Sequence, residues 1–397
     1  MAQLSDRLNR LAPSATLAMS QKSNEMKAQG VDVINMSVGE PDFNTPDHIK
    51  EAGKKAIDDN FSKYSPVPGY MDLREAIVEK LKKENGLAYT TNEVIAGTGG
   101  KQGVCNTILA LVNPGDEVII PAPYWVSYPQ MAKLAGATPV VVRAGFEQEF
   151  KMTAEQLEAA ITPKTKMLIL CSPSNPTGSV YSQEELNALA EVILKHEDIF
   201  VLSDEIYEHI NYVGKAASIA SYPGMKERTI ICNGVSKAYA MTGWRLGWVA
   251  APAWIVKGIN KLQGQYTSGT CDVSQKAAVA AYVASQDCVE QMRVAFERRR
   301  DLIVKLAKDI PGLEVNVPQG AFYLFPKCSS FFGKSDGETV INNSTDFAMY
   351  ILEKAHVATV GGDAFGDPDC FRMSYATSDD NIREAMRRIK EVLAVLK

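Results

Sequence analysis

The sequence has 397 residues, of which 46% are apolar and 22% are charged, and its formal net charge is −5 at pH 7. This length has room for about two domains, and the acidic balance provides no general attraction to nucleic acid or to an anionic membrane surface. Because the N-terminus lacks a signal-peptide core and no stretch approaches the roughly 18 apolar residues of a spanning helix, we expect a cytoplasmic protein without nucleic-acid or membrane partners.

Short apolar segments alternate with helical patterns from about residue 90 onward. Several of these segments are continuously apolar, which is typical of strands in a parallel sheet that helices cover on both faces. The sequence therefore predicts an α/β fold, with a large domain over residues 46–290 that contains a mainly parallel, mixed sheet. The expected strands are EVIAG at 93–97, DEVIIP at 116–121, TPVVV at 138–142, KMLILC at 166–171, IFVLSD at 199–204, RTIICNG at 228–234 and RLGWVAA at 245–251.

Longer helical patterns dominate from about residue 273, including the segment VEQMRVAFERRRDLIVKLAKDI at 289–310. Two apolar segments, GAFYLFP at 320–326 and CFRMSYA at 370–376, interrupt them and indicate a smaller α+β unit. The first 45 residues lack the sheet pattern and could pack with this unit. We therefore expect a small domain, made of residues 1–45 and 291–397, that closes over the site, with the boundary inside a continuous helix.

Five of the expected strands end in loops with unusual chemistry, and ligands of a parallel sheet bind outside the carboxyl ends of its strands. Taken singly, each loop has an ordinary explanation. The glycines of the first loop could form a tight turn, Asn175 could be a turn former, Asp204 could cap a helix, and Lys237 could be a solvated lysine. The loops are GTGGKQG at 97–103, PAPYWVSY at 121–128, CSPSNPTG at 171–178, DEIYEH at 204–209 and NGVSK at 233–237.

The first and the last of these loops together suit a phosphate group. A glycine turn at the start of a helix exposes backbone N–H groups that favour phosphate, here those of Gly99, Gly100 and Lys101. Ser236 and Arg245 would add a hydroxyl and a cation. A phosphate thus explains why a serine and an arginine stand between two apolar strands.

The other loop residues suit a flat ring that carries an aldehyde. Trp125 could stack on the ring, Asp204 could pair with a protonated ring nitrogen, and Asn175 with Tyr207 could bind a phenolic oxygen. Lys237 could form a Schiff base with the aldehyde. Pyridoxal 5'-phosphate is the common cofactor with all of these features, so we expect it here. The four histidines have no metal-ligand spacing, so we expect no metal.

A series of ordered motifs covers essentially the whole chain: SVGEPDF at 37–43, KYSPVPGYMDLREA at 63–76, GGKQ at 99–102, PYWVSYP at 123–129, SPSNPTG at 172–178, SDEIYEH at 203–209, SKAYAMTGWRLG at 236–247 and MSYATS at 373–378. The chain resembles the fold-type I pyridoxal-phosphate aminotransferases in these motifs, and specifically the bacterial aspartate aminotransferases of the Ib subgroup. It does not depart from their pattern at the cofactor positions.

The resemblance implies roles for three further residues. Tyr64 matches a tyrosine that reaches the phosphate of the neighbouring subunit, which implies a homodimer with shared sites. Arg372 matches the arginine that binds the substrate α-carboxylate, a contact that suits its fork of donors. Gly39 matches a glycine whose amide touches the same carboxylate. The alternatives are a surface aromatic for Tyr64, a structural ion pair for Arg372 and a turn glycine for Gly39.

The resemblance also implies the reaction, transfer of the amino group of L-aspartate to 2-oxoglutarate through a Schiff base. Lys237 would move the proton, Asp204 would keep the ring nitrogen protonated, and Tyr207 would complete the catalytic set. Lys101 would meet the distal carboxylate of the substrate. Trp125 and Asn175 would also contact the substrate. A prephenate or broad aromatic aminotransferase is the alternative enzyme. A pyridoxal-phosphate-binding regulatory protein is the alternative of another class.

Overall fold

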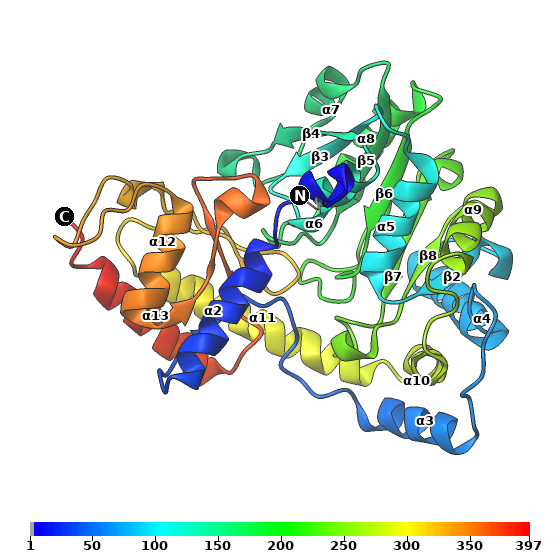
Figure 1. The fold of residues 1–397 in the computed structure, drawn as a ribbon, viewed down its shortest axis with the longest axis horizontal. Helices are drawn as coiled ribbons and strands as arrows, with labels where there is room; N and C mark the ends of the chain where they lie inside the picture. Colours follow the sequence, from blue (N-terminus) through cyan, green and yellow to red (C-terminus); the bar gives the residue numbers. More distant parts are fainter. Residues whose placement is uncertain (1–3) are drawn as a thin grey trace.

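The computed structural model describes residues 4–397, which form an α/β protein (Figure 1). The strands are β1 (Ile34–Asn35), β2 (Val94–Gly97), β3 (Glu117–Ala122), β4 (Thr138–Arg143), β5 (Thr165–Cys171), β6 (Phe200–Asp204), β7 (Thr229–Gly234), β8 (Gly247–Ala250), β9 (Tyr323–Leu324), β10 (Val357–Ala358), β11 (Val360–Gly361) and β12 (Phe371–Ser374). The α-helices are α1 (Asp6–Asn9), α2 (Ala15–Ala28), α3 (Asp47–Asp58), α4 (Met71–Lys80), α5 (Gly100–Leu111), α6 (Ser127–Leu134), α7 (Ala154–Ala160), α8 (Gln183–Leu194), α9 (Ala253–Gly264), α10 (Asp272–Val283), α11 (Asp287–Lys308), α12 (Ser344–Tyr350) and α13 (Asp379–Leu393).

The largest sheet has seven strands in the order β2-β8-β7-β6-β5-β3-β4. The strands from β3 to β7 pair in parallel, whereas β8 lies antiparallel between β2 and β7. The prediction of an α/β fold with a mainly parallel, mixed sheet is therefore confirmed.

Helices cover both faces of this sheet, and side chains alternate along its strands between one apolar core on one face and two on the other. In β5, Met167 and Ile169 pack into the core formed with α5, α6 and α9. Leu168 and Leu170 point the other way, into the core formed with α7 and α8. Because both faces are covered, the strand is apolar at consecutive positions, and this is the pattern that the sequence displays.

On the left of Figure 1, α2, α12 and α13 lie around two small sheets, whereas α3, α4 and α10 lie with the large sheet on the right. β1 pairs in parallel with β10, with Ile34 opposite Val357, so the N-terminal segment joins the C-terminal part of the chain. The long helix α11 is continuous across residue 290 and runs between the left and right parts of the view in Figure 1. The division into domains stays a prediction. Within residues 4–397, every helix is too short or too polar to cross a membrane.

Replacing Leu202 in the central strand β6 tests the packing of the sheet. The side chain is fully buried, so Leu202→Ala should lower the free energy of unfolding by about 2–5 kcal/mol, because it leaves a cavity as well as less buried surface. Urea unfolding of the purified protein measures this loss. The matched control, Leu8→Ala, removes the same atoms from a side chain that is 49% exposed and should change stability by less than about 0.5 kcal/mol. Equal losses would contradict the assigned core.

Candidate active site

A cavity of about 290 Å³ lies at the carboxyl ends of β5, β6 and β7. The parallel register explains why their last residues meet, because Cys171 stands opposite Asp204 and Asp204 stands opposite Cys232. Most of the predicted site residues line this cavity, although they come from distant parts of the sequence. These residues are Gly39, Gly100, Lys101, Trp125, Asn175, Asp204, Tyr207, Ser236, Lys237, Arg245 and Arg372.

Lys237 extends into the cavity from the loop that follows β7, and its Nζ donates a hydrogen bond to the carbonyl oxygen of Gly39 at 2.6 Å. Burial, opposed by Glu40 but reinforced by the positive charges of Arg372 and Arg245, lowers the pKa of the Lys237 amine to about 8. A neutral amine is therefore accessible near neutral pH. The side chain is half-buried, so the alternative of an ordinary solvated lysine is wrong.

Asp204 is buried at the end of β6, where its Oδ2 accepts a hydrogen bond from the Tyr128 hydroxyl at 2.7 Å. Its Oδ1 accepts a longer one from the amide of Ile206 at 3.3 Å. Burial raises the pKa of the Asp204 carboxyl, and the Tyr128 hydrogen bond partly offsets this rise. A protonated ring nitrogen would favour the ionised form. The alternative that Asp204 caps a helix is wrong, because the residues that follow it form turns.

Arg372 belongs to β12, the central strand of the three-stranded sheet, and is 2% exposed. In the described part of the chain its hydrogen-bond acceptors are neutral: Asn175 Oδ1 lies 2.8 Å from one terminal nitrogen, and the carbonyl of Ser37 accepts from the other. Within residues 4–397, the Nε atom of Arg372 has no hydrogen-bond partner. The guanidinium lies 4.7 Å from the centre of the Tyr323 ring. The alternative of a structural ion pair is therefore wrong, and a buried cation with an open donor is left for an anionic ligand.

Tyr207 is buried and shares a 2.7 Å hydrogen bond with the hydroxyl of Tyr323. Tyr323 belongs to β9, which pairs with β12, so one side chain contacts both Tyr207 and the Arg372 guanidinium. A Cβ atom on Gly39 would stand 2.1 Å from the Tyr323 hydroxyl, so this position has room for glycine alone. The close approach explains the glycine better than a turn does.

The phosphate expected from the sequence has a matching cradle. Gly99 has φ 79° and caps the N-terminus of α5, which begins at Gly100. A Cβ atom on Gly99 would stand 2.3 Å from the Arg245 guanidinium, which donates to the carbonyl of Thr242 at 2.8 Å. Ser236 lines the cavity from the neighbouring loop. A glycine turn, a helix N-terminus, a hydroxyl and a cation thus converge, and this donor set fits the phosphate of pyridoxal phosphate.

Lys101 and Trp125 lie together at the cavity, with the Lys101 Nζ 4.9 Å from the centre of the indole ring. Partial desolvation and the charge of Arg245 lower the pKa of the Lys101 amine. The Lys101 side chain remains exposed to solvent in the single chain, so its ammonium can pair with an anionic group of a ligand.

Two predicted site residues do not line this cavity: Gly99, which directly precedes the lining residue Gly100, and the more distant Tyr64. The side chain of Tyr64 is fully exposed and lies in a surface groove with Gly269 and Thr270. One chain by itself therefore does not bring Tyr64 to its own phosphate cradle.

Several lining residues escaped the sequence reasoning. Tyr128 lies within the recognised PYWVSYP motif, and its position in a helix that faces the sheet could have indicated contact with Asp204. Tyr323 stands in an apolar strand that gave no chemical signal. Ser14, Thr16 and Leu17, at the start of α2, also line the cavity, and their polar surroundings in the sequence resemble any exposed helix start.

Comparisons with known proteins agree with this geometry. The family model for aminotransferase class I and II matches residues 31–389. The chain is 49% identical over 399 residues to an aspartate/prephenate aminotransferase of Cereibacter sphaeroides, with all of both chains covered. It is 48% identical to a bifunctional aspartate and glutamate/aspartate-prephenate aminotransferase of Petunia hybrida, with 99% of this chain and 83% of that protein covered.

Solved structures give the same result. The aspartate aminotransferase of Rhizobium meliloti has a TM-score of 0.97 and 43% identity, and all of both chains is covered. The aspartate aminotransferase of Thermus thermophilus with maleate has a TM-score of 0.93 and 40% identity, with 99% of this chain and 100% of that chain covered. This chain therefore belongs to the class I and II aminotransferase family, and its fold is the pyridoxal-phosphate-dependent transferase fold type I with pyridoxal 5'-phosphate as cofactor.

Proposed function

We propose that this chain transfers the amino group of L-aspartate to 2-oxoglutarate, giving oxaloacetate and L-glutamate. The observation that carries the proposal is the buried guanidinium of Arg372, which has a free Nε and no carboxylate partner in the described residues. The α-carboxylate of an amino acid fits its planar fork of donors. Oxaloacetate formation from L-aspartate and 2-oxoglutarate by the purified holoenzyme tests the proposal directly.

The predicted site residues that line the cavity each have an assignment in this reaction. When bound, pyridoxal phosphate supplies a carbonyl for the amino group and an electron-poor ring that weakens the Cα–H bond. Lys237 would hold the cofactor at rest and would then, as a free amine, move the proton from the substrate Cα to C4′ of the cofactor, the former aldehyde carbon on the other side of the amino nitrogen. Asp204 keeps a proton on the ring nitrogen, while Tyr207 and Asn175 donate to the phenolic oxygen. The buried positions of Asp204 and Tyr207 support these assignments, because hydrogen bonds are stronger where water is excluded.

The phosphate and the ring have their own assignments. The amides from Gly99 to Lys101, the hydroxyl of Ser236 and the guanidinium of Arg245 bind the phosphate, and Trp125 stacks on the ring. Their convergence on one cavity supports this proposal.

A dicarboxylic substrate is supported by two cations on the same cavity. Arg372 binds the α-carboxylate together with the amide of Gly39, and Lys101 meets the distal carboxylate beside Trp125. Maleate, the compound named with the T. thermophilus enzyme, likewise carries two carboxylates.

A second donor or acceptor class is favoured by one observation, the word prephenate in the names of the C. sphaeroides and P. hybrida relatives. Prephenate also carries two carboxylates, so Arg372 and Lys101 could bind it in the same way. A comparison of aspartate, prephenate and aromatic substrates on one sample separates these activities. The complete set of catalytic residues argues against a purely regulatory protein.

We also infer a homodimer in which Tyr64 completes the phosphate site of the partner. The full exposure of Tyr64 in one chain supports this inference. Residues 46–290 form the large domain in this proposal, and residues 1–45 with 291–397 form a small domain that closes over the site. Tyr323 and Arg372 belong to the proposed small domain, and they contact Tyr207 and Asn175 of the proposed large domain. These contacts support closure of the small domain over the site. The cytoplasmic location stays a prediction.

Replacing Lys101 tests the substrate assignment. Lys101→Gln keeps the backbone amide and most of the stem but removes the charge, and a charge-assisted contact is worth roughly 1.5–3 kcal/mol, or on the order of ten- to a hundredfold in kcat/KM. We expect that loss for aspartate and glutamate, with little change for alanine or phenylalanine. Arg372→Lys is the control, because it should weaken every amino donor. An equal loss for dicarboxylic and neutral donors in Lys101→Gln would remove the support for aspartate.

The amine of Lys237 should set the pH dependence of the reaction. Because its pKa is lowered to about 8 and the neutral form is the base, kcat should rise with pH and level off above about pH 8. Steady-state rates between pH 6 and 9.5 measure the profile. Lys237→Ala should bind the cofactor through its phosphate but lose nearly all transamination. The control is Lys166→Ala, near the N-terminal end of β5 and away from the cavity, which should leave the pH profile unchanged. Full activity of Lys237→Ala would place the base elsewhere.

Hybrid dimers test the role of Tyr64. A Tyr64→Phe chain should bind the cofactor more weakly, and a Lys237→Ala chain should be inactive. Mixed dimers of the two contain one site with both native residues, so at limiting cofactor their activity should exceed the sum of the separate samples. In the control, the double variant is mixed with Lys237→Ala, and no dimer has an intact site. Absence of any gain, or full activity from a monomer, would refute the shared site.

A further inference from the structure

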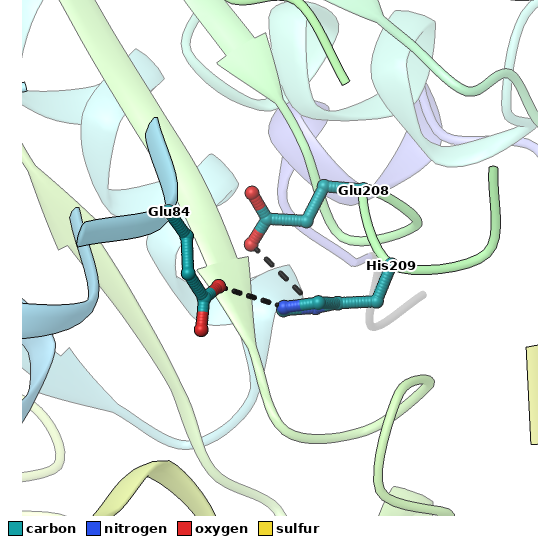
Figure 2. A group of neighbouring side chains, drawn as sticks. All are labelled: Glu84, Glu208 and His209. Atoms are coloured by element: carbon teal, nitrogen blue, oxygen red, sulfur yellow. Dashed lines mark hydrogen bonds and ion pairs between the residues drawn. The ribbon is translucent and has the colours of Figure 1, made fainter. Parts of the chain in front are cut away.

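Glu84, Glu208 and His209 form a compact group at the carboxyl side of β6, shown in Figure 2. Their side-chain nitrogen and oxygen atoms lie within 4.8 Å of one another, as the ligands of a metal ion would. The ring of His209 lies between the two carboxylates, and its Nε2 is 2.9 Å from Glu84 Oε2. However, the ammonium of Lys80 is hydrogen-bonded to Glu208 Oε1, so a cation already neutralises the central carboxylate and would repel a metal.

Both carboxylate oxygens of Glu208 accept hydrogen bonds. Besides Lys80, its Oε1 accepts from Asn233 Nδ2 at 2.6 Å, and its Oε2 accepts from Asn85 Nδ2 at 2.8 Å. The side chains of Lys80 and Glu208 are 2% and 5% exposed. Burial alone would raise the pKa of Glu208, but Lys80, His209 and Asn85 together lower it to about 2. The Glu208 carboxylate is therefore ionised at every physiological pH. Its hydrogen bonds are strong because they involve a charge and because burial excludes water from them.

These contacts join the two segments that carry the chemistry. Glu208 directly follows Tyr207 in the chain, and Asn233 is four residues before Lys237. Asn233 has a second bond, because its Oδ1 accepts the N–H of Gly234 at 2.7 Å and so fixes the first peptide of the lysine loop. Lys80 closes α4, and Asn85 closes the short π-helix Leu81–Asn85 that follows it. One buried carboxylate thus ties the Tyr207 turn and the Lys237 loop to the same helical support.

We propose that Glu208 is a positioning residue for transamination, which holds the Lys237 loop and the Tyr207 turn in register through Asn233. The inference deepens the proposed function and depends on the role of Lys237 in it. Glu208 lines no part of the cavity and acts only through the residues that it aligns.

The pKa of the Lys237 amine indicates whether Glu208 keeps the Lys237 loop in place. Glu40 and Asp204 favour its charged form, Arg372 and Arg245 favour its neutral form, and burial favours the neutral form most strongly. A loosened loop would let water reach the amine. The pKa of Lys237 would then rise from about 8 toward that of a solvated lysine.

Two asparagine substitutions separate positioning from simple stability. Asn233→Ala and Asn85→Ala each delete one hydrogen bond to Glu208 and one further bond, to Gly234 or to Lys80. Only Asn233 belongs to the lysine loop. We expect Asn233→Ala to lower kcat on the order of tenfold with little change in KM, and to move the acidic limb of the kcat profile to higher pH. Asn85→Ala should leave that limb in place.

A second readout is independent of turnover. The full chain, stripped of cofactor, is treated with an amine-reactive reagent across a pH range, and modification of Lys237 is followed by peptide mass spectrometry. The pKa of the Lys237 amine should be higher in Asn233→Ala than in the native chain and unchanged in Asn85→Ala. If both variants leave this pKa and the pH profile unchanged while losing similar stability in urea, Glu208 is only structural and the proposal is overturned.

Two further arms keep the test decisive. If Asn233→Ala does not fold, Asn233→Ser puts a smaller polar side chain in the same buried place and cannot reach Glu208, so the same shift is expected of it. Lys237→Ala, measured alongside, separates the two proposals. Activity in Lys237→Ala would refute the proposed function, whereas an unaltered Lys237 pKa in an Asn233 variant of a working aminotransferase would refute the positioning role alone.

Discussion

The parallel register of β5, β6 and β7 is the constraint on which the site depends. It brings Cys171, Asp204 and Cys232 to one level, so the loops that follow these strands open into the same cavity. Among the residues that line that cavity are the cationic side chains of Lys101, Lys237, Arg245 and Arg372. The surrounding protein leaves the charges of Lys237 and Arg372 partly uncompensated. Unpaired buried charge is costly, so the site favours a ligand that offsets it, and this connects the sheet topology to the chemistry of a phosphate, a carboxylate and an aldehyde.

Much of this arrangement could be predicted from the sequence, because the decisive signals are local. Continuous apolar runs such as KMLILC indicated strands that are covered on both faces, and β5 shows this burial at Met167 and Leu168 alike. Residues at strand ends, among them Asp204 and Lys237, followed from the rule that these ends share one edge of the sheet. The chemistry of Arg372 was visible because a charge inside an apolar strand requires a partner.

The rest depends on contacts between elements that are distant in the chain, and no local pattern encodes them. Tyr323 looks like an ordinary core aromatic, yet its hydroxyl meets Tyr207 and limits position 39 to glycine. Likewise Lys80 looks like one more lysine on an amphipathic helix, although its ammonium lies buried against Glu208. Tertiary packing decides which residues these side chains contact. The sequence alone does not indicate it for Lys80, because lysines on helices are mostly exposed.

The uninterrupted helix α11 adds a mechanical consequence. Its 22 residues form a rod about 33 Å long. Phe296 packs with ring centres 5.1 Å from Phe322, the neighbour of Tyr323, so the rod is attached to the strand beneath the Arg372 guanidinium. A rigid rod does not absorb motion along its length; it amplifies it. A tilt of about 5° at one end moves the other by about 3 Å, roughly the length of one hydrogen bond. Phe296 lies nine residues from the start of α11, about 13.5 Å along the helix, so such a tilt would move its contact with Phe322 by about 1 Å and would displace the C-terminal end most.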